Sequence, residues 1–180
     1  MIPRDLRLRT ARLELRPTEP ADAPRLSEIQ SDWNVTRMLR LAPWPPDPAA
    51  MAQWVAGHPN EWREGTAYRF AVILDGRLVG QTDVDDINGP DGEIGYWFEA
   101  SAWGTGIATE AAGALVRFAL QELGLTRLRA GHAGDNPASG KVLEKLGFRE
   151  VETAMRMSRP HGRPTPYRFL ELRAPVSLAM

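Results

Sequence analysis

Two glycines stand directly before a run with helical periodicity in the stretch WFEASAWGTGIATEAAGALVRF, residues 97 to 118. Gly104 and Gly106 can take backbone angles that other residues avoid, and they remove side chains that would keep a ligand away. The first turn of the helix that follows presents N–H groups without intrahelical partners, at the positive end of the helix dipole. Such a turn can bind a phosphate.

The same stretch has a simpler interpretation, a tight turn between strand and helix in which glycine only satisfies the geometry. It also differs from the two commoner phosphate loops. The third residue after Gly106 is Thr109, so there is no GxGxxG, and no GxxxxGK[ST] is present. The turn alone therefore leaves an anion site and a structural turn as alternatives.

Several polar residues near this turn could move protons. Glu93 opens the strand-like segment EIGYWFE and could act as a base or be a solvated acid. His132 ends a later apolar segment and has a suitable ordinary pKa, although it could equally be a packed residue. Asp83 and Asp85 share one face of a strand, where they could bind a cationic acceptor or face water.

Composition excludes several kinds of site. The absence of cysteine excludes disulfides, thiolate metal sites and cysteine nucleophiles, and the three histidines lack metal-ligand spacing. Because 22 basic and 23 acidic residues nearly cancel, nothing suggests nucleic-acid binding through bulk charge. No apolar segment approaches the roughly 18 residues of a membrane span, and the N-terminus lacks a signal-peptide pattern. We expect a cytoplasmic protein with no metal, no nucleic acid and no membrane partner.

The first part of the chain predicts a strand followed by helices. Leu13 and Leu15 alternate with charged residues in a short strand that stops at Pro17. Residues 23 to 39 have the spacing of one or two short amphipathic helices. The segment APWPPDPAA interrupts the helical pattern. Within it, Asp47 is an expected N-cap, with Pro48 at the first helical position of the next helix.

A three-stranded meander and a long helix come next. A strand at 68 to 74, the DG turn at 75 and 76, and RLVGQTDV form a predicted hairpin, and EIGYWFE is the third strand. The helix spans roughly 105 to 123. Its periodicity buries Ile107, Ala111, Leu115 and Phe118 and leaves Glu110, Arg117 and Gln121 available to solvent.

The rest of the chain predicts a parallel strand, a helix and two further strands. Residues 125 to 131 are apolar enough for a buried strand reached by crossing over the long helix. NPASGKVLEKLG is a helix with Asn136 as N-cap, and strands near 148 to 157 and 166 to 173 flank the loop RPHGRPTP. Without a repeat or linker, residues 1–180 predict one domain of α/β (α+β) class with a mixed sheet and helices on its faces.

Two motifs together carry a family resemblance. EIGYWFEASAWGTGIATEA, followed further on by NPASGKVLEKLGF, resembles the acyl-CoA-dependent N-acetyltransferase (GNAT) superfamily, in the branch of the ribosomal-protein-alanine N-acetyltransferases. The motifs cover residues 93 to 148, and the element order extends the resemblance over almost the whole chain. It implies the GNAT fold, with a mixed, mostly antiparallel central sheet splayed between the fourth and fifth strands. It also implies acetyl-CoA as co-substrate and no metal.

The resemblance implies which residues contact the cofactor. Trp103 stands where the family's pyrophosphate loop usually has Arg or Gln, a departure that leaves the backbone donors intact. The implied diphosphate contacts are Trp103, Gly104, Thr105, Gly106, Ile107, Ala108 and Thr109. The pantetheine arm would lie in the splay, along the backbone of Tyr96, Trp97 and Phe98.

Asn136 and Ser139 match residues that face the cofactor in this branch. The alternatives are that Asn136 only caps its helix and that Ser139 only occupies the first turn.

Acyl transfer to an amine needs a base, oxyanion stabilisation and a proton for the departing thiolate. A strand N–H near Tyr96 to Phe98 could meet the oxyanion. Many family members protonate the thiolate with a tyrosine, but Leu143 occupies that position, so the resemblance favours Ser139 as the acid. Glu93 matches a catalytic glutamate of several members, and His132 is the alternative base.

The sequence therefore predicts an acyl-CoA-dependent N-acyltransferase that transfers acetyl to a primary amine by direct attack on the thioester. With no cysteine and no G-x-S-x-G, no covalent intermediate is expected.

The identity of the acceptor stays open between a protein N-terminus and a small-molecule amine. Acyl donors larger than acetyl-CoA and a homodimer also remain possible. Trp33, Trp44 and Trp54 could shape the acceptor pocket or belong to the core. A non-catalytic acyl-CoA-binding sensor or assembly module is the alternative function, and an unrelated nucleotide-binding protein is a third.

Overall fold

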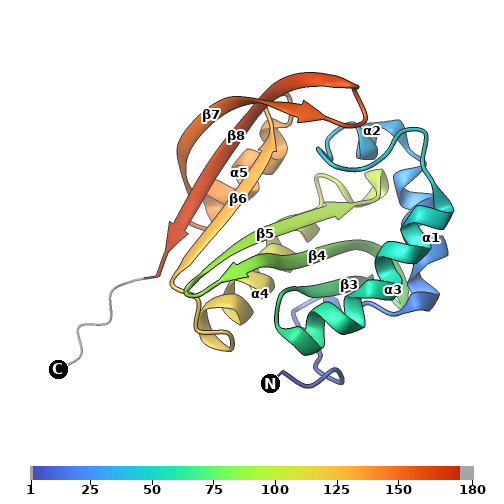
Figure 1. Ribbon diagram of the computed structural model, residues 1–180. Coiled ribbons are helices and arrows are strands. Elements are labelled where there is room, and N and C mark those ends of the chain that lie inside the picture. The colour runs from blue at the N-terminus through green and yellow to red at the C-terminus, as the bar shows by residue number, and fades with distance from the viewer. Residues whose placement is uncertain (1, 175–180) are drawn as a thin grey trace.

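A computed structural model describes residues 2–174, which form one eight-stranded sheet with helices on both faces (Figure 1). The strands run in the order β1-β2-β3-β4-β5-β6-β8-β7. Only β5 and β6 pair in parallel, and the other neighbours are antiparallel. The predicted mixed, mostly antiparallel sheet is confirmed. The strands are Leu8–Arg9 (β1), Leu13–Pro17 (β2), Tyr68–Leu74 (β3), Arg77–Asn88 (β4), Asp91–Phe98 (β5), Arg127–Ala133 (β6), Arg149–Ser158 (β7) and Arg163–Arg173 (β8).

Helices cover the two faces of the sheet and enclose two apolar cores. The helical segments are Pro20–Asp22 (η1), Ala23–Gln30 (α1), Trp33–Thr36 (α2), Pro48–Glu64 (α3), Ala100–Ala102 (η2), Ile107–Gln121 (α4) and Pro137–Lys145 (α5). Helices α1 and α3 enclose a smaller core on one face, and α4 packs over the larger core on the other. The predicted cap of α3 is present, since Asp47 accepts hydrogen bonds from the N–H groups of Ala49 and Ala50, each 3.0 Å long.

The hairpin between β3 and β4 turns where the DG pair predicts. Asp75 and Gly76 have φ values of 49° and 77°, and both are positive as a two-residue type I′ turn requires. The turn brings Leu74 opposite Arg77 and so fixes the register of β4, against which β5 then pairs.

The sheet splays between β5 and β6, the fourth and fifth of the predicted strands. Parallel pairing runs only from Asp91 opposite Arg127 to Ile94 opposite Ala130. Beyond Ile94, β5 continues along β4 while β6 continues along β8, and the two strands diverge in Figure 1. The predicted splay is confirmed.

Two predicted boundaries were wrong. Helix α4 begins at Ile107 rather than near 105, because Gly104 and Gly106 take positive φ values of 74° and 84°. Strand β8 begins at Arg163, so the two prolines at 164 and 166 belong to a strand and not to the loop. Both prolines lie where β8 pairs with β7 alone, a position that tolerates a residue without an N–H group.

Candidate functional site

The loop before α4 presents a row of open hydrogen-bond donors. No N–H group from Gly104 through Thr109 has a partner among the described residues. Gly106, the N-cap of α4, offers no side-chain cap, and residues 103 to 106 are exposed. The N–H of Trp103 differs, because it donates to the carbonyl of Ala100 at 3.1 Å. The open donors therefore begin at Gly104, at the positive end of the helix dipole, where an anion is favoured.

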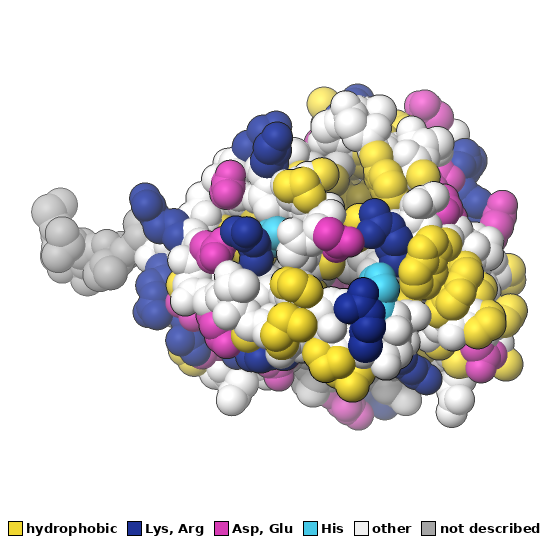
Figure 2. All heavy atoms as spheres, turned by 90° about the horizontal axis from the view of Figure 1, so that it is seen from above, with side chains coloured by type: hydrophobic (Ala, Val, Ile, Leu, Met, Phe, Trp, Pro, Cys, Tyr) yellow, Lys and Arg dark blue, Asp and Glu magenta, His cyan; other side chains and the backbone are white. Residues whose placement is uncertain are grey.

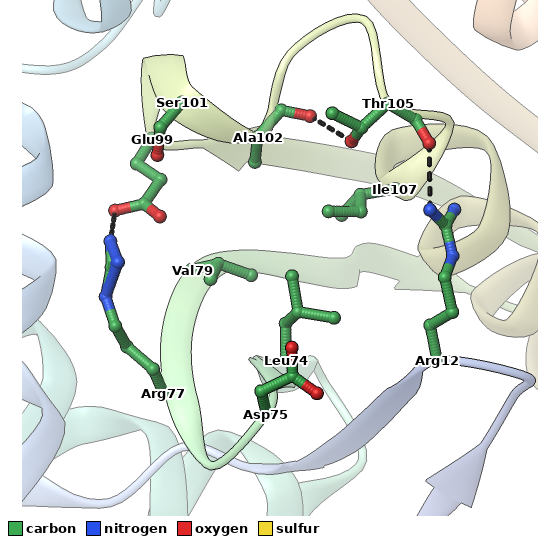
Figure 3. A pocket seen from close by; sticks show the side chains of 10 residues that line it. All are labelled: Arg12, Leu74, Asp75, Arg77, Val79, Glu99, Ser101, Ala102, Thr105 and Ile107. Atoms are coloured by element: carbon green, nitrogen blue, oxygen red, sulfur yellow. Dashed lines mark hydrogen bonds and ion pairs between the residues drawn. The ribbon is translucent and has the colours of Figure 1, made fainter.

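Arg12 braces this loop from the N-terminal strands. Its backbone N–H and its Nε donate to the two carboxylate oxygens of Glu110 at 2.8 and 2.7 Å. Its Nη1 donates to the carbonyl of Thr105 at 2.9 Å, as Figure 3 shows. The expectation that Glu110 faces solvent was wrong, because this pairing, together with a hydrogen bond from Thr10, occupies its carboxylate.

A cavity of about 500 Å³ lies between the loop and the β3–β4 hairpin. Figure 3 shows Arg12 on one side and Arg77, paired with Glu99, on the other. Its other lining residues are Leu74, Asp75, Val79, Ser101, Ala102, Thr105 and Ile107. Neither Glu93 nor Ser139 lines this cavity. The cavity therefore lies behind the loop and is separate from the residues predicted to take part in the reaction.

Tyr96 connects β5 to the first turn of α5. Its hydroxyl lies 2.9 Å from Ser139 Oγ, where either oxygen can donate, and 3.1 Å from the Ser139 carbonyl. Asn136 Oδ1 accepts from the Ser139 N–H at 3.2 Å, so Asn136 caps α5. Burial raises the pKa of Tyr96 to about 12, which keeps its proton available at neutral pH. The structure thus joins Tyr96, Asn136 and Ser139 at the open end of the splay.

The neighbours of Tyr96 in β5 have other surroundings. Trp97 points to the opposite face, where it packs against the smaller core. Phe98 is 4% exposed in the larger core, and its carbonyl accepts a 3.0 Å hydrogen bond from Trp103 Nε1. The side chain of Trp103 therefore folds back onto β5, which leaves the loop donors uncovered.

Glu93 lies on the other face of the sheet with an unpaired carboxylate. Among residues 2–174 it makes no side-chain hydrogen bond and no ion pair. Burial raises the pKa of Glu93, and the nearby Asp85 adds to the effect. The ring of Tyr167 lies over Gly131 of β6, where a Cβ would come within 2.3 Å of a ring carbon. Because Arg129 and Gly131 face the same side as Glu93, the tyrosine ring covers this side of the splay.

Tyr167 and Arg40 complete this face, and the sequence did not single them out. Burial and the nearby Glu93 raise the pKa of Tyr167 to about 12, and the Arg40 guanidinium lies 5.9 Å from the centre of its ring. The Arg40 carbonyl accepts from the N–H of Arg159 at 2.8 Å, which ties the segment after α2 to the β7–β8 hairpin. The sequence pattern placed only the loop RPHGRPTP beside this region and assigned Tyr167 and Arg40 no role.

His132 lies on the face opposite Glu93. It is 6% exposed, its Nδ1 is 2.8 Å from the Ala133 carbonyl, and its Nε2 would be 2.9 Å from a Cβ on Gly140 of α5. Adjacent strand residues point to opposite faces, so His132 and Gly131 cannot share one side. This placement separates the two candidate bases.

Asp83 and Asp85 pair with an arginine whose side chain is only 10% exposed. Arg69 Nη1 lies 3.1 Å from Asp83 and 3.2 Å from Asp85, and Arg69 Nε donates to Glu61 at 2.7 Å. Burial raises the pKa of Asp83 to about 6. Neither of the two expected roles for Asp83, a cationic acceptor site or a contact with water, fits this arrangement.

The three tryptophans divide between surface and core. Trp33 and Trp44 are 37% and 40% exposed, and their rings are 4.9 Å apart. Trp54 instead is partly buried and packs against the smaller core, with Arg69 5.2 Å from its ring centre. In the view from above, hydrophobic side chains gather in patches among basic ones (Figure 2). The ring of His161, in the β7–β8 turn, lies 5.3 Å from that of Trp33, so this partly exposed apolar surface lies beside the β7–β8 hairpin.

Two absences hold for the described part of the chain. No helix there is long and apolar enough to cross a membrane. Residues 2–174 also contain no group of three His, Asp or Glu side chains placed to hold a metal ion.

Comparisons with known proteins agree on one family. The family model described as an acetyltransferase (GNAT) domain matches residues 12–149. The uncharacterized N-acetyltransferase p20 of Bacillus licheniformis is 31% identical over 147 residues, which cover 79% of this chain and 82% of that protein. The putative ribosomal N-acetyltransferase YdaF of Bacillus subtilis (strain 168) is 31% identical over 147 residues, covering 77% and 78%.

A solved structure supports the same assignment. Mycobacterium smegmatis RimJ in complex with CoA-disulfide superposes with a TM-score of 0.80 and 26% identity, over 93% of this chain and 84% of that one. A protein with this fold thus accommodates coenzyme A.

Proposed function

Because the chain belongs to the acetyltransferase (GNAT) domain family, we propose that it acetylates the α-amine of a protein N-terminus, with Glu93 as base and Ser139 as acid. The enzyme is an acyl-CoA-dependent N-acetyltransferase, with acetyl-CoA as co-substrate and an amine that attacks the thioester directly. One observation carries the site assignment: the open N–H groups of Gly104 through Thr109 lead to the splayed ends of β5 and β6.

The donors of the loop would hold the diphosphate. Gly104 and Gly106 expose the backbone, and Ile107, Ala108 and Thr109 are the first residues of α4, whose N–H groups have no intrahelical partner. The edge of β5 beyond Ile94, from Tyr96 to Phe98, is free of β6 and can pair with an extended arm. Acetyl-CoA supplies the activated acyl group. Trp103 contributes through its side chain, which packs back toward Phe98.

Glu93 would take the proton of the attacking amine. An aliphatic amine is mostly protonated at neutral pH, so a base must act before or during attack. The carboxylate of Glu93 has no partner among the described residues, and its raised pKa makes it a better base than a surface glutamate. Tyr167 beside it would confine the amine to the gap.

Ser139 would protonate the departing thiolate. As the new C–N bond forms and the C–S bond breaks, the amine proton passes to Glu93 and the Ser139 Oγ proton passes to sulfur. The Tyr96 hydroxyl, 2.9 Å from Ser139 Oγ, would return a proton to it. Water would then reprotonate Tyr96 and take up the proton held by Glu93, so that both groups are restored after each turnover. Strand N–H groups near Tyr96 to Phe98 would stabilise the oxyanion. His132 stays an alternative base only if the acceptor enters from the face of α5.

A protein N-terminus is favoured over a small amine for two reasons. The similar Bacillus subtilis protein is named a putative ribosomal N-acetyltransferase. The partly exposed Trp33 and Trp44 offer an apolar surface that fits a peptide side chain better than a polyamine. We also propose that residues 1–180 form one domain and that the enzyme acts in the cytoplasm. The reaction would need no metal, and the protein would bind neither nucleic acid nor membrane. A homodimer stays a prediction.

The test is release of free thiol from acetyl-CoA with a panel of amines. We expect turnover with peptides that begin with Ala, Ser or Met, little with polyamines or aminoglycosides, and no effect of a chelator. Glu93→Gln should lower kcat by about 10² to 10⁴ while calorimetric affinity for coenzyme A is kept. Glu122→Gln, an exposed carboxylate at the end of α4, is the matched control.

Other results would redirect the proposal. Turnover with small amines alone would replace the acceptor class. Binding of acetyl-CoA without turnover on any amine would favour another acyl donor or the non-catalytic sensor. If Gly106→Trp bound coenzyme A as tightly as the wild type, the diphosphate assignment would be wrong, because Gly106 has φ 84° at the centre of the loop.

A further inference from the structure

Two segments that are far apart in the sequence meet beside Glu93. The N–H of Arg159, in the β7–β8 turn, donates to the carbonyl of Arg40 at 2.8 Å. The β7–β8 hairpin and the segment after α2 accordingly lie side by side at the top of Figure 1. Tyr167 of the same hairpin covers the Glu93 side of the splay. An acceptor bound at Glu93 therefore has both segments as neighbours.

These two segments are rich in arginine and contain no acidic residue. Residues 33–46 and 153–170 have no Asp or Glu, but they have six arginines, at positions 37, 40, 156, 159, 163 and 168. Three of the six pair with acidic residues from outside these ranges, namely Arg37 with Asp135, Arg156 with Glu152 and Arg168 with Glu150. Arg40, Arg159 and Arg163 form no ion pair within residues 2–174. In a chain of net charge −1, uncompensated positive charge therefore gathers beside Glu93.

Arg40 is the most buried of these three arginines. It is half-buried, whereas Arg159 and Arg163 are exposed, and its guanidinium lies 5.9 Å from the centre of the Tyr167 ring. Burial and Asp85 raise the pKa of Glu93, and Arg129 and Arg40 oppose that rise, so the charge of Arg40 acts at the candidate base. An arginine removed from water normally has an anionic partner. Because Arg40 has none in the described chain, its position fits a partner that arrives with the substrate.

The missing partner is a carboxylate of the acceptor. We propose that Arg40 binds an acidic side chain at the second or third residue of the acceptor, so that the enzyme prefers protein N-termini with an acidic residue directly after the first. This inference rests on the proposed acetylation of a protein N-terminus at Glu93. An extended peptide advances about 3.4 Å per residue, so its second and third side chains can reach a guanidinium beside Tyr167. The planar fork of arginine can bind both oxygens of a carboxylate.

The outer part of this surface fits the rest of an acidic peptide. Arg159 and Arg163 add positive charge around the β7–β8 turn, and the partly exposed Trp33 and Trp44 add apolar area. Complementary charge of this kind selects one partner over another more than it adds affinity. Nucleic acids present a long row of phosphates and bind larger basic surfaces, whereas three arginines match the few carboxylates of a peptide.

Matched peptides test the preference on the full-length wild type. Release of free thiol from acetyl-CoA is measured with peptides that begin Ala-Asp-Asp, Ala-Asn-Asn or Ala-Lys-Lys and are otherwise identical. We expect kcat/KM to be about tenfold higher for the Asp peptide than for the Asn peptide, lowest for the Lys peptide, and less different in high salt. Equal values for the Asp and Asn peptides would overturn this inference and leave the proposed function intact. No turnover on any peptide would overturn both.

Variants of Arg40 assign the preference to this residue. Arg40→Gln should bring the ratio of the Asp and Asn peptides close to one, and Arg40→Glu should reverse the order in favour of the Lys peptide. Arg117→Glu is the matched control, because Arg117 is an exposed arginine of α4, on the other face of the sheet, and the wild-type ratio should be kept.

A ratio of two peptides on one protein is insensitive to a general loss of activity or to a changed pKa of Glu93. Arg40 has no ion pair to lose within residues 2–174, so thermal unfolding should show folded variants. A ratio that survives Arg40→Gln would overturn the role of Arg40. Faster turnover of free aspartate than of the Asp peptide would show that the carboxylate belongs to a small molecule and would overturn the peptide assignment.

Discussion

At the scale of single residues, Arg12 holds the loop that we propose binds the diphosphate. Partial burial would raise the pKa of Glu110, but hydrogen bonds from Thr10 and Arg12 outweigh it and keep that pKa below its ordinary value. Glu110 is therefore charged in the first turn of the helix whose N-terminus would bind an anion, and Arg12 compensates its charge.

Arg12→Lys should raise the KM for acetyl-CoA about tenfold and change kcat less than about twofold. Lysine cannot form the paired contact to Glu110 while also reaching the Thr105 carbonyl. Steady-state kinetics at saturating acceptor give both constants. Arg9→Lys is the control, because Arg9 is 76% exposed and pairs with Glu14 at the surface. An equal fall in kcat would indicate general damage to the fold instead.

Tyr96 and Ser139 should act as one unit. Tyr96→Phe removes the hydroxyl that contacts Ser139, and Ser139→Ala removes the acid, so each should lower kcat about tenfold without changing coenzyme A affinity. The double variant should be no slower than the worse single variant, since residues in one proton relay are not additive. Effects that multiply would show that the two hydroxyls act independently.

Local sequence patterns predicted some of these residues and missed others for a physical reason. The cap of Asn136 and the glycines of the loop depend on neighbours a few positions away, which the sequence displays. The pairing of Arg12 with Glu110 joins residues 98 positions apart, and that of Tyr96 with Ser139 spans 43. Such contacts depend on which strands become neighbours, so no local pattern identifies them.

At the scale of elements, α3 places a histidine against the sheet. His58 is 2% exposed, its Nδ1 lies 2.7 Å from Thr18 Oγ1, and its ring meets Trp54 edge-on at 4.4 Å. Burial and the nearby Arg69 lower the pKa of His58 to about 4. The packing of α3 on β3 therefore requires a neutral imidazole.

Acid should loosen this packing. Above pH 6.5 the imidazole is neutral in both states, and as the pH falls toward 4 only the unfolded chain takes up the proton, so stability is lost. The difference between 6.5 and about 4, at about 1.4 kcal/mol per pH unit, gives at most about 3.5 kcal/mol. Denaturant unfolding at several pH values measures it.

His58→Gln is the comparison for this prediction, because glutamine does not titrate. The stability difference between wild type and variant should change across this pH range. Asp83, with a pKa of about 6, acts in the opposite direction, since its stabilisation falls as the pH rises, but it is common to both proteins. A difference that is constant with pH would show that His58 is not the titrating group.

Element types were largely predictable, and element ends were less so. The DG turn and the Asp47 cap depend on backbone geometry that a few residue types satisfy. The start of β8 was missed because prolines usually end a strand, and only the absence of a second neighbour at Pro164 makes them acceptable there. The choice of face for Glu93 and His132 likewise depended on how β5 pairs with β6 and on the packing of α5 against β6.

At the scale of the whole molecule, the sheet consists of two parts joined weakly. Strands β1 to β5 and strands β6 to β8 share only the four residue pairs between Asp91–Ile94 and Arg127–Ala130. A ligand in the splay would contact both parts. Coenzyme A at 100 times its dissociation constant should therefore stabilise the fold by about 2.7 kcal/mol.

Thermal unfolding with and without coenzyme A checks this. NAD at the same concentration should have no effect, and Gly106→Trp should lose the response to coenzyme A. An equal shift with NAD would support a general nucleotide-binding protein.

The resemblance of two motifs was enough to predict the splay, whereas the acceptor surface depends on loops whose contacts, such as Arg40 with Arg159, are not encoded locally.

The open donors before α4 belong to the backbone, and this affects how the site can be discovered. Replacing Trp103, Thr105, Ile107 or Thr109 by alanine leaves every one of those N–H groups in place. In an alanine scan, the usual survey for binding residues, substitutions at these four positions should therefore cause little loss of coenzyme A affinity. Within the loop itself, the informative changes are bulky side chains at Gly104 and Gly106, which have positive φ values. If the loop holds the cofactor as proposed, variation among its side chains is accordingly a poor guide to the site.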